Sequence, residues 1–446
     1  MSMIGHFCAQ PREKILAGAL NPVRLLLPTR EIESWCHAEG YVWRRRIWEP
    51  VVTLLACVFK QLTRGSTREV EDWIASLYGD GSAQRYGSNF CAARQRLPLS
   101  IFKRAVKHVG GIVTNTSGLT MKDLRVWLLD GTTLRTVNTR CNDAQFGRSR
   151  NSVRESRSPI LRMILLACAG SGAVLDVAIG PYVTSELALF GEMLRSFPAN
   201  GLLVADSCYA TFMSLTMVQR RGSHLLARYR KNHQRCLVKR LARGDELHRW
   251  KRPSHSTVVL WAKEVAGCPE FMEVRIISGN VVRKGYRTWE LCLATTLLDP
   301  KQYPADELIA LYLRRWDVEL SLRTLKTDYQ MAQLTAKSPE LVHKEILSMV
   351  LAYNCVVATI AASGQSVRRV SHVRARTLLL LYSERMVAAS TVRLPSLHKE
   401  MLKFIATAML TLQVRLPQPR AIVQRPSPYP VLMTTRDKWR REYYAA

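Results

Sequence analysis

Acidic residues are scarce in this chain of 446 residues. Aspartate and glutamate together number 35 against 65 lysines and arginines, so the net charge is +30. Like charges repel one another in a compact fold, and such an excess is costly unless a polyanion neutralises it. Nucleic acid is the commonest polyanionic partner, and an anionic membrane is the minor alternative. Charge alone also leaves open a basic protein whose surface is merely solvated.

Several motifs that carry chemistry are missing. The eleven cysteines include no Cys-x-x-Cys pair, and the ten histidines show neither His-Glu-x-x-His nor another zinc spacing. These absences exclude the common zinc sites. The odd number and irregular spacing of the cysteines argue against a disulfide framework and favour a reducing cytoplasm. No Gly-x4-Gly-Lys-Ser/Thr loop occurs, so ATP is not expected.

Long apolar runs are also few. Hydrophobic residues make up 47% of the chain, which is enough to bury a core and excludes a mainly disordered protein. The N-terminal apolar stretch is too short for a signal peptide. Residues 346–367 carry no charge and are long enough to span a bilayer, but polar side chains interrupt them. A buried core helix followed by a turn is therefore predicted, with no membrane partner.

The order of predicted elements indicates an α/β fold. Apolar strand-like runs alternate with helical segments in the second quarter of the chain, which is typical of a sheet covered by helices. Residues 1–120 are predicted to form a helical DNA-binding domain, residues 121–230 the first part of the α/β core, and residues 231–300 a β-rich insertion. Residues 301–337 are predicted to complete the core with one long helix, and residues 338–446 to form a helical C-terminal region with a basic tail.

The predicted insertion begins with a strongly basic stretch at residues 231–252. These side chains are expected to line DNA, and a solvated charged loop is the alternative. Three β-rich pieces fill the insertion, at residues 256–261, 273–278 and 288–294. A single long helix is then predicted over residues 305–331.

Two of the strand-like runs in the core, 124–130 and 201–206, end in an aspartate. The carboxyl ends of strands are where ligand crevices open in α/β sheets, although an aspartate in an ordinary turn gives the same pattern. At about 100° per residue, one face of the predicted helix holds a carboxylate among cations and aromatics, namely Tyr312, Arg315, Trp316, Glu319 and Lys326. A plain amphipathic helix, with Glu319 paired to Arg315, is the alternative.

Asp130, Asp206 and Glu319 together provide three carboxylates. Two Mg²⁺ ions about 3.5–4 Å apart need such a set, because hard cations prefer oxygen ligands. One ion would activate the attacking water or hydroxyl, and the other would stabilise the leaving oxygen. With a net charge of +30, the natural substrate is a phosphodiester.

The spacing Tyr312-x2-Arg315-x3-Glu319-x6-Lys326 resembles the Tyr-Arg-Glu-Lys signature of the IS-four family of bacterial insertion-sequence transposases. The segment that begins Asp130-Gly-Thr-Thr is similar to the first aspartate segment of that family. Asp206-Ser-Cys-Tyr resembles the second, an Asp-x-x-Tyr pattern, although a cysteine stands where a glycine is frequent. The resemblance covers about residues 120–430, including a long gap before the glutamate, as in members that insert a β subdomain there.

This resemblance implies an RNase H-like catalytic core with a DDE active site. It implies magnesium-dependent cut-and-paste transposition: nicking at the transposon ends, a DNA hairpin, and strand transfer by the freed 3′-hydroxyl. Asp130, Asp206 and Glu319 would bind two Mg²⁺ ions, for which Mn²⁺ can substitute. Tyr312, Arg315 and Lys326 are implied to contact backbone phosphates of the DNA. Trp316 is implied to contact bases that are distorted at the cut.

The implied partners are the double-stranded DNA of the transposon ends and of the target, together with further copies of this chain assembled on DNA. The implied location is the bacterial cytoplasm, in association with the nucleoid. A transposase-derived DNA-binding protein without cleavage activity is the alternative, but the intact acidic triad argues against it. A nuclease of the RNase H type without strand transfer is a third hypothesis.

Overall fold

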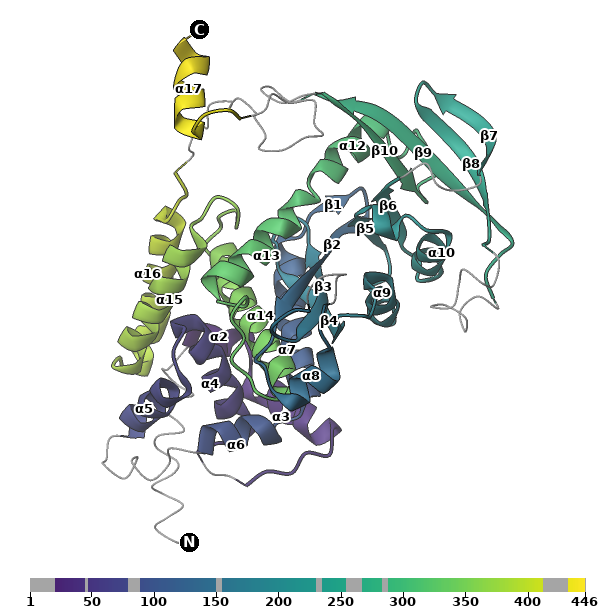
Figure 1. Cartoon of the computed structure of the whole chain (residues 1–446). Helices are drawn as coiled ribbons and strands as arrows, with labels where there is room; N and C mark the ends of the chain where they lie inside the picture. The colour runs from purple at the N-terminus through teal and green to yellow at the C-terminus, as the bar shows by residue number, and fades with distance from the viewer. Residues whose placement is uncertain are drawn as a thin grey trace.

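In the part of the chain that the structure describes, a mixed sheet of ten strands has helices on both of its faces (Figure 1). The structure is a computed structural model. It describes residues 21–44, 47–78, 89–149, 155–229, 235–253, 267–282, 288–411 and 432–445.

The described part of the N-terminal segment is helical, as predicted. Its helices are α2 (Asn21–Leu26), α3 (Thr29–Ala38), α4 (Pro50–Thr63), α5 (Thr67–Tyr78), α6 (Asn89–Arg96) and α7 (Leu99–Ser117). Helix α4 begins with a proline, whose missing N–H costs nothing in the first turn. It ends at Arg64, which takes the left-handed conformation that closes a helix.

The α/β core alternates strands and helices, as predicted. Its strands are β1 (Thr120–Met121), β2 (Leu124–Arg135), β3 (Ile160–Cys168), β4 (Val174–Pro181), β5 (Gly201–Ala205) and β6 (His224–Arg228). Between them lie α8 (Arg140–Phe146), α9 (Glu186–Leu194), the short turn η2 (Ser207–Tyr209) and α10 (Phe212–Arg220). The strand order is β4-β3-β2-β5-β6. Strands β2, β3 and β4 are antiparallel neighbours, whereas β5 and β6 run parallel to β2.

The inserted strands continue this same sheet. They are β7 (Arg235–Ala242), β8 (Asp245–Lys251), β9 (Phe271–Val281) and β10 (Trp289–Thr295), and β10 pairs with β6. A buried ion pair ties β9 to β8 and to the segment after β10: Arg275 Nε donates to Asp245 Oδ1 at 2.8 Å, and another guanidinium nitrogen donates to the carbonyl of Tyr303 at 2.7 Å. The strands predicted at 273–278 and 288–294 are confirmed, and the one at 256–261 lies outside the described residues.

Alternating side chains of β2 enter two different cores, since successive residues of a strand face opposite sides of a sheet. Val126 and Leu128 pack with α7, α13 (Trp316–Asp328) and α14 (Pro339–Ala362) on one face. Trp127 and Leu129 pack with α9 and α10 on the other. The sheet therefore separates two apolar layers, and the face that a site residue occupies decides which helices it meets.

The C-terminal helices are α14 (Pro339–Ala362), α15 (His372–Val387), α16 (Leu394–Thr407) and α17 (Arg436–Ala445), with a short turn η5 (Thr391–Arg393) before α16. Helix α14 is apolar and long enough to cross a membrane, with a mean hydropathy of 1.7, but 89% of its most apolar window is buried inside the protein. The predicted buried core helix is confirmed. Residues 417–431 of the tail, which was predicted to start at residue 417, lie outside the described residues.

The single helix predicted over residues 305–331 is wrong. The structure has two helices, α12 (Ala305–Leu313) and α13 (Trp316–Asp328), which follow one another along the molecule (Figure 1). At the junction, the N–H groups of Arg314 and Arg315 donate to carbonyls three residues back instead of four. Bonds of this kind tighten the turn, so the side chains after the junction lie at a different angle from the one that a continuous helix predicts.

Candidate active site

Asp130 and Asp206 lie side by side at the junction of β2 and β5. The parallel pairing of these strands ends at Leu128 and Val204, so the two aspartates stand at equivalent positions two residues further on. Neighbouring strands are about 4.8 Å apart. Asp206 is still extended, with φ −75° and ψ 175°. Both side chains therefore point to the face that Leu128 and Val204 share with α13.

The prediction that Asp206 directly follows a strand is confirmed, because β5 ends at Ala205. The prediction that Asp130 ends its strand is wrong, since β2 continues to Arg135. The reason is β3, which pairs with β2 along its other edge from Trp127 to Arg135 and extends the strand beyond the point where β5 ends. Asp130 is thus held by a backbone ladder on one side and is open on the other.

Glu319 lies on α13, whose Val318, Leu322 and Leu325 pack against the sheet face to which both aspartates point. The helix therefore brings the third acid of the predicted set to the same side of the sheet. Arg315 Nη2 donates to Glu319 Oε1 at 3.1 Å, and the arginine side chain is only 11% exposed. The arginine–glutamate pairing foreseen as an alternative is therefore present, beside the two aspartates.

The electrostatics tie these side chains into one cluster. Burial raises the pKa of Asp130 from 3.8 to about 6, and the charges of Glu319 and Glu186 add to the increase against the pull of Arg315. Burial alone would lower the pKa of Arg315, but Tyr312 and the three acids together raise it above its ordinary value. The guanidinium is therefore within electrostatic reach of all three carboxylates and is their common counter-charge.

The predicted DNA contacts are not equally accessible. Tyr312, at the end of α12, is 4% exposed, and its burial raises the pKa of its hydroxyl to about 12. Trp316 is 59% exposed, and the Arg315 guanidinium lies 5.6 Å from its ring centroid. Lys326 is in the last turn of α13, roughly 10 Å along the axis from Glu319. The junction interrupts the single helix on which the shared arc was predicted, yet Tyr312 remains within electrostatic reach of Arg315 and Asp206.

The donor set suits a hard divalent cation in its chemistry, since all three groups are carboxylates. Across the described ranges, however, no group of three or more histidine, cysteine, aspartate or glutamate side chains is already close enough to hold a metal ion. The Arg315 guanidinium provides the positive charge beside Glu319 instead. The residues fit a metal by type and by the face that they share, but they are not a preformed cage.

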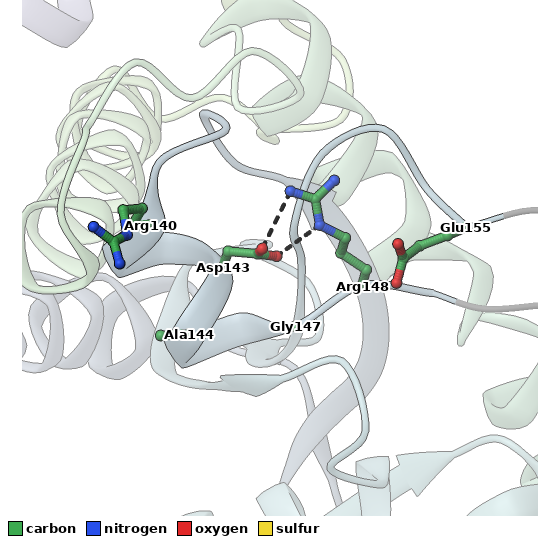
Figure 2. A pocket seen from close by; sticks show the side chains of 6 residues that line it. All are labelled: Arg140, Asp143, Ala144, Gly147, Arg148 and Glu155. Carbon is green, nitrogen blue, oxygen red and sulfur yellow. Dashed lines mark hydrogen bonds and ion pairs between the residues drawn. The ribbon is translucent and has the colours of Figure 1, made fainter.

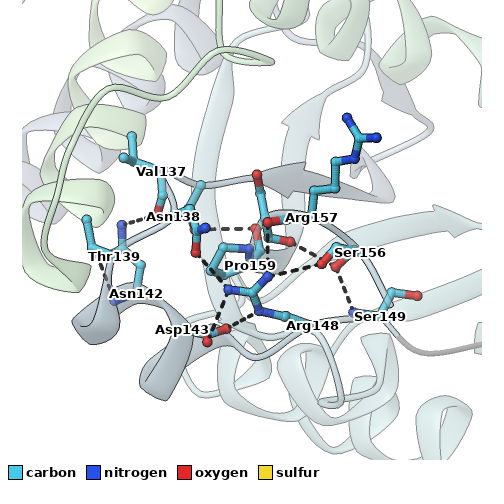
Figure 3. A network of polar contacts seen from close by, with 12 residues as sticks. Val137, Asn138, Thr139, Asn142, Asp143, Arg148, Ser149, Ser156, Arg157 and Pro159 are labelled. Atoms are coloured by element: carbon cyan, nitrogen blue, oxygen red, sulfur yellow. Dashed lines mark hydrogen bonds and ion pairs between the residues drawn. The ribbon is translucent and has the colours of Figure 1, made fainter. Parts of the chain in front are cut away.

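An open hollow of about 570 Å³ beside α8 contains none of the three acids (Figure 2). Its most polar wall is Arg148, which donates to Asp143 Oδ1 and to Asn138 Oδ1, both at 2.7 Å, and to two main-chain carbonyls (Figure 3). The guanidinium therefore holds the loop after α8 against Asn138, Asp143 and the main chain of residues 156–157. The hollow is lined by Arg140, Asp143, Ala144, Gly147, Arg148 and Glu155.

A fourth acid beside the aspartates, Glu186, was missed in the sequence. It is the first residue of α9, directly after Ser185, whose hydroxyl caps the helix by accepting from the N–H of Ala188. A glutamate after a serine cap is common at helix starts, where it also complements the helix dipole. The local pattern therefore could not distinguish this glutamate from an ordinary capping acid, and only its contacts do so.

A model of the transposase DDE domain matches residues 121–355, which is more than half of the chain. The chain belongs to the DDE transposase family. The transposase InsG of insertion sequence element IS4 from Escherichia coli (strain K12) is 26% identical to this transposase over 354 residues, covering 76% of each chain. The resemblance to the IS-four family is thereby confirmed.

The chain also aligns with a cryo-EM structure of the piggyBac transposase synaptic complex with hairpin DNA, over 91% of this chain and 88% of the chain in that structure. The sequence identity is 9% and the TM-score is 0.40, which is too low to assign the fold of this chain from that structure. Family membership alone makes the chain a DNA transposase, an enzyme that cleaves and transfers DNA strands with the aid of a divalent metal. The matched span contains Asp130, Asp206 and Glu319.

Proposed function

We propose that this transposase carries out cut-and-paste transposition of an insertion sequence through Asp130, Asp206 and Glu319. In this proposal the three carboxylates hold two Mg²⁺ ions, which Mn²⁺ can replace. The enzyme nicks the transposon ends, passes through a hairpin and joins the freed 3′-hydroxyl to target DNA. When bound, the ions supply positive charge to the attacking and leaving oxygens of the phosphodiester.

The observation that carries this proposal is the shared position of the acids. Asp130 and Asp206 stand at equivalent places on neighbouring strands and point to the face covered by α13, the helix of Glu319. Burial, together with the charges of Glu319 and Glu186, raises the pKa of Asp130 to about 6 even beside Arg315, so a bound cation would stabilise its charged form. The strand order β4-β3-β2-β5-β6, with three antiparallel strands followed by two parallel ones, supports an RNase H-like core.

The cationic residues have separate parts in the proposal. Arg315 neutralises the acids before DNA arrives and contacts a backbone phosphate afterwards, because guanidinium suits both carboxylate and phosphate. Lys326 and Tyr312 hold further phosphates near the cleaved end. Trp316, which is 59% exposed, offers a face on which a base displaced from the duplex can stack.

The proposed DNA path extends to the inserted strands and to a second copy of the chain. Three exposed basic side chains lie on one face of β7 and β8, namely Lys239, Arg249 and Lys251, of which the last two form long ion pairs with Glu273 and Glu270. Such a stripe suits a phosphate backbone. We place the enzyme in the bacterial cytoplasm with the nucleoid, as a homo-oligomer that holds two transposon ends.

The test is magnesium-dependent nicking of a duplex that carries the inverted repeats flanking the coding region. Glu319→Ala is expected to lower the nicking rate by roughly 10³-fold or more, since it removes several kcal/mol of transition-state stabilisation. Binding of the same duplex should stay within about twofold of wild type, because a carboxylate does not hold phosphate. Asp130→Ala should behave in the same way.

The matched control is Glu307→Ala on α12, an acid that is 46% exposed and only 3.9 Å from Lys122 in a surface ion pair. Its nicking rate should equal that of wild type. If the Glu319 variant nicks as fast as the control, the proposed catalytic role is wrong. If wild type binds the ends but neither it nor any variant nicks, the alternative of a DNA-binding protein without cleavage is favoured.

A further inference from the structure

Glu186 contacts the chain immediately after both aspartates. Its Oε2 accepts a hydrogen bond from the Tyr209 hydroxyl at 3.3 Å, and Tyr209 closes the short turn that starts at the residue after Asp206. The thiol of Cys208, in the same turn, lies 3.9 Å from that oxygen. Tyr209 is 1% exposed and packs edge-on against Phe190 of α9, so the turn is seated on the helix that carries Glu186.

The same carboxylate lies over Gly131, the residue after Asp130. A Cβ at position 131 would stand 2.5 Å from the Glu186 carboxyl carbon and 2.6 Å from its Oε1, which is far inside van der Waals contact. Only a glycine lets the glutamate approach the strand this closely. Because neighbouring residues of a strand face opposite sides, Glu186 touches β2 from the face opposite to the Asp130 side chain.

A third contact holds the carboxylate itself. Arg162, on the neighbouring strand β3, places its Nη1 3.7 Å from Glu186 Oε1 and donates to the carbonyl of Tyr182. The helix start at Ser185 adds the favourable end of the helix dipole. Glu186 is therefore anchored from β3 and α9 while it touches the segments of Asp130 and Asp206.

We propose that Glu186 is a positioning residue of the transposase site, which sets the spacing of Asp130 and Asp206 through its contact with Gly131 and its hydrogen bond with Tyr209. It touches neither DNA nor metal in this role. The proposal rests on the assignment of the two aspartates as metal ligands. Ligand groups must be held within about 0.5 Å of their working geometry, and a displacement near 1 Å can lower a rate about a hundredfold.

The test compares variants that differ in one property of the side chain. Glu186→Ala removes the acceptor and is expected to slow nicking about 10–100-fold and to raise the Mg²⁺ concentration needed for half-maximal rate about 5-fold or more. Glu186→Gln keeps the size and the accepting oxygen and should stay within about 3-fold of wild type. Tyr209→Phe removes only the donor and should slow nicking about 3–10-fold.

Two readouts do not depend on turnover. Affinity for the end duplex should be unchanged in all three variants. The rise in Tm that Mg²⁺ produces should be smaller for Glu186→Ala than for Glu186→Gln. The matched control is Glu192→Ala, an exposed acid on the same helix, which should alter neither the rate nor the response to Mg²⁺.

A pairwise test uses the close approach directly. Gly131→Ala should slow nicking strongly in the wild-type background and much less when Glu186 is already alanine, because the clashing carboxylate is gone. Equal losses in both backgrounds contradict the proposal, as does a Glu186→Gln variant that is as slow as Glu186→Ala. If Asp130→Asn nicks normally, the assigned site fails and this proposal with it. If Asp130→Asn is inactive but Glu186→Ala is normal, only the positioning role fails.

Discussion

Two carboxylates of this transposase show opposite surroundings. Glu345, on α14, is 2% exposed and accepts hydrogen bonds from the N–H and the hydroxyl of Thr335 and from the N–H of Ala336, at 2.6–3.3 Å. Among the described residues, Asp130 accepts a hydrogen bond only from the N–H of its neighbour Gly131, at 3.0 Å, and its burial, together with the charges of Glu319 and Glu186, raises its pKa.

This difference distinguishes a carboxylate that holds the fold together from one that is available to bind a ligand. Glu345 uses its oxygens to fix the loop that joins α13 to α14, and the preceding Lys344 is fully buried and donates to the carbonyls of Arg94 and Gln95 at the end of α6. Asp130 keeps lone pairs free in a partly buried position near Glu319 and Glu186, where Arg315 offsets only part of the cost of its charged form. Glu345, which accepts several hydrogen bonds within the protein, therefore supports the fold, whereas Asp130, which has few hydrogen-bond partners, belongs to the candidate site.

The largest effect on stability is expected at the scaffold. Glu345→Ala leaves the buried N–H of Ala336 and the N–H and hydroxyl of the exposed Thr335 without their acceptor and should lower the free energy of unfolding by about 2 kcal/mol. Chemical denaturation of the purified protein measures this loss. The exposed Glu384→Ala on α15 is the control and should change stability by less than about 0.5 kcal/mol. Equal stability of the two variants would contradict the structural role of Glu345.

A smaller effect of opposite sign is expected at the site. Because folding raises the pKa of Asp130 from 3.8 to about 6, the folded protein without metal binds this proton more tightly than the unfolded chain. The resulting stabilisation is complete below about pH 4 and is lost as the pH rises through about 6. At pH 8, Asp130→Asn should therefore stabilise the protein by ~1 kcal/mol, after allowance for partial exposure.

Thermal unfolding in a chelating buffer checks this prediction, with an expected gain in Tm of about 1–3 °C at pH 8 that shrinks towards pH 5. Addition of Mg²⁺ should raise the Tm of wild type more than that of the variant. A variant that is no more stable than wild type at pH 8 would contradict the conclusion that the charged form of Asp130, unlike that of Glu345, destabilises the folded protein.

The smallest effect is expected for Lys326→Ala, at the far end of α13. If this lysine holds one phosphate, its loss should weaken binding of the end duplex about 3-fold at 0.1 M salt and reduce the salt slope by about 0.9. Titrations at several salt concentrations measure both quantities. An unchanged slope would show that the cation lies outside the DNA path.

Most of the regular elements could be predicted from local pattern. The apolar runs that became β3 and β5 were visible because nearly all of their side chains are buried, and the run in β10 because its last five residues are mostly buried. Asp206 was found for the same reason, since it ends such a run. The continuation of β2 beyond Asp130 was not visible, because the next residues, Gly131, Thr132 and Thr133, are small or polar and the strand is paired there with β3.

The candidate site was predicted in composition but not in arrangement. The helical wheel drawn over Tyr312 and Trp316 assumed one continuous helix, and a change of hydrogen bonding at Arg314 and Arg315 leaves no mark in residue spacing. Glu186 was missed because a glutamate at a capped helix start has an ordinary local explanation.

The sequence by itself determined the basic charge, the α/β order of elements, the buried nature of α14 and the residues that form the family signature, because each of these depends on composition or on short-range periodicity. Only the tertiary structure decided that the acids share one face of the sheet, that Arg315 lies among them and that Glu186 reaches both aspartate segments. Those relations depend on strand register and helix packing between segments far apart in the chain, which no local pattern encodes.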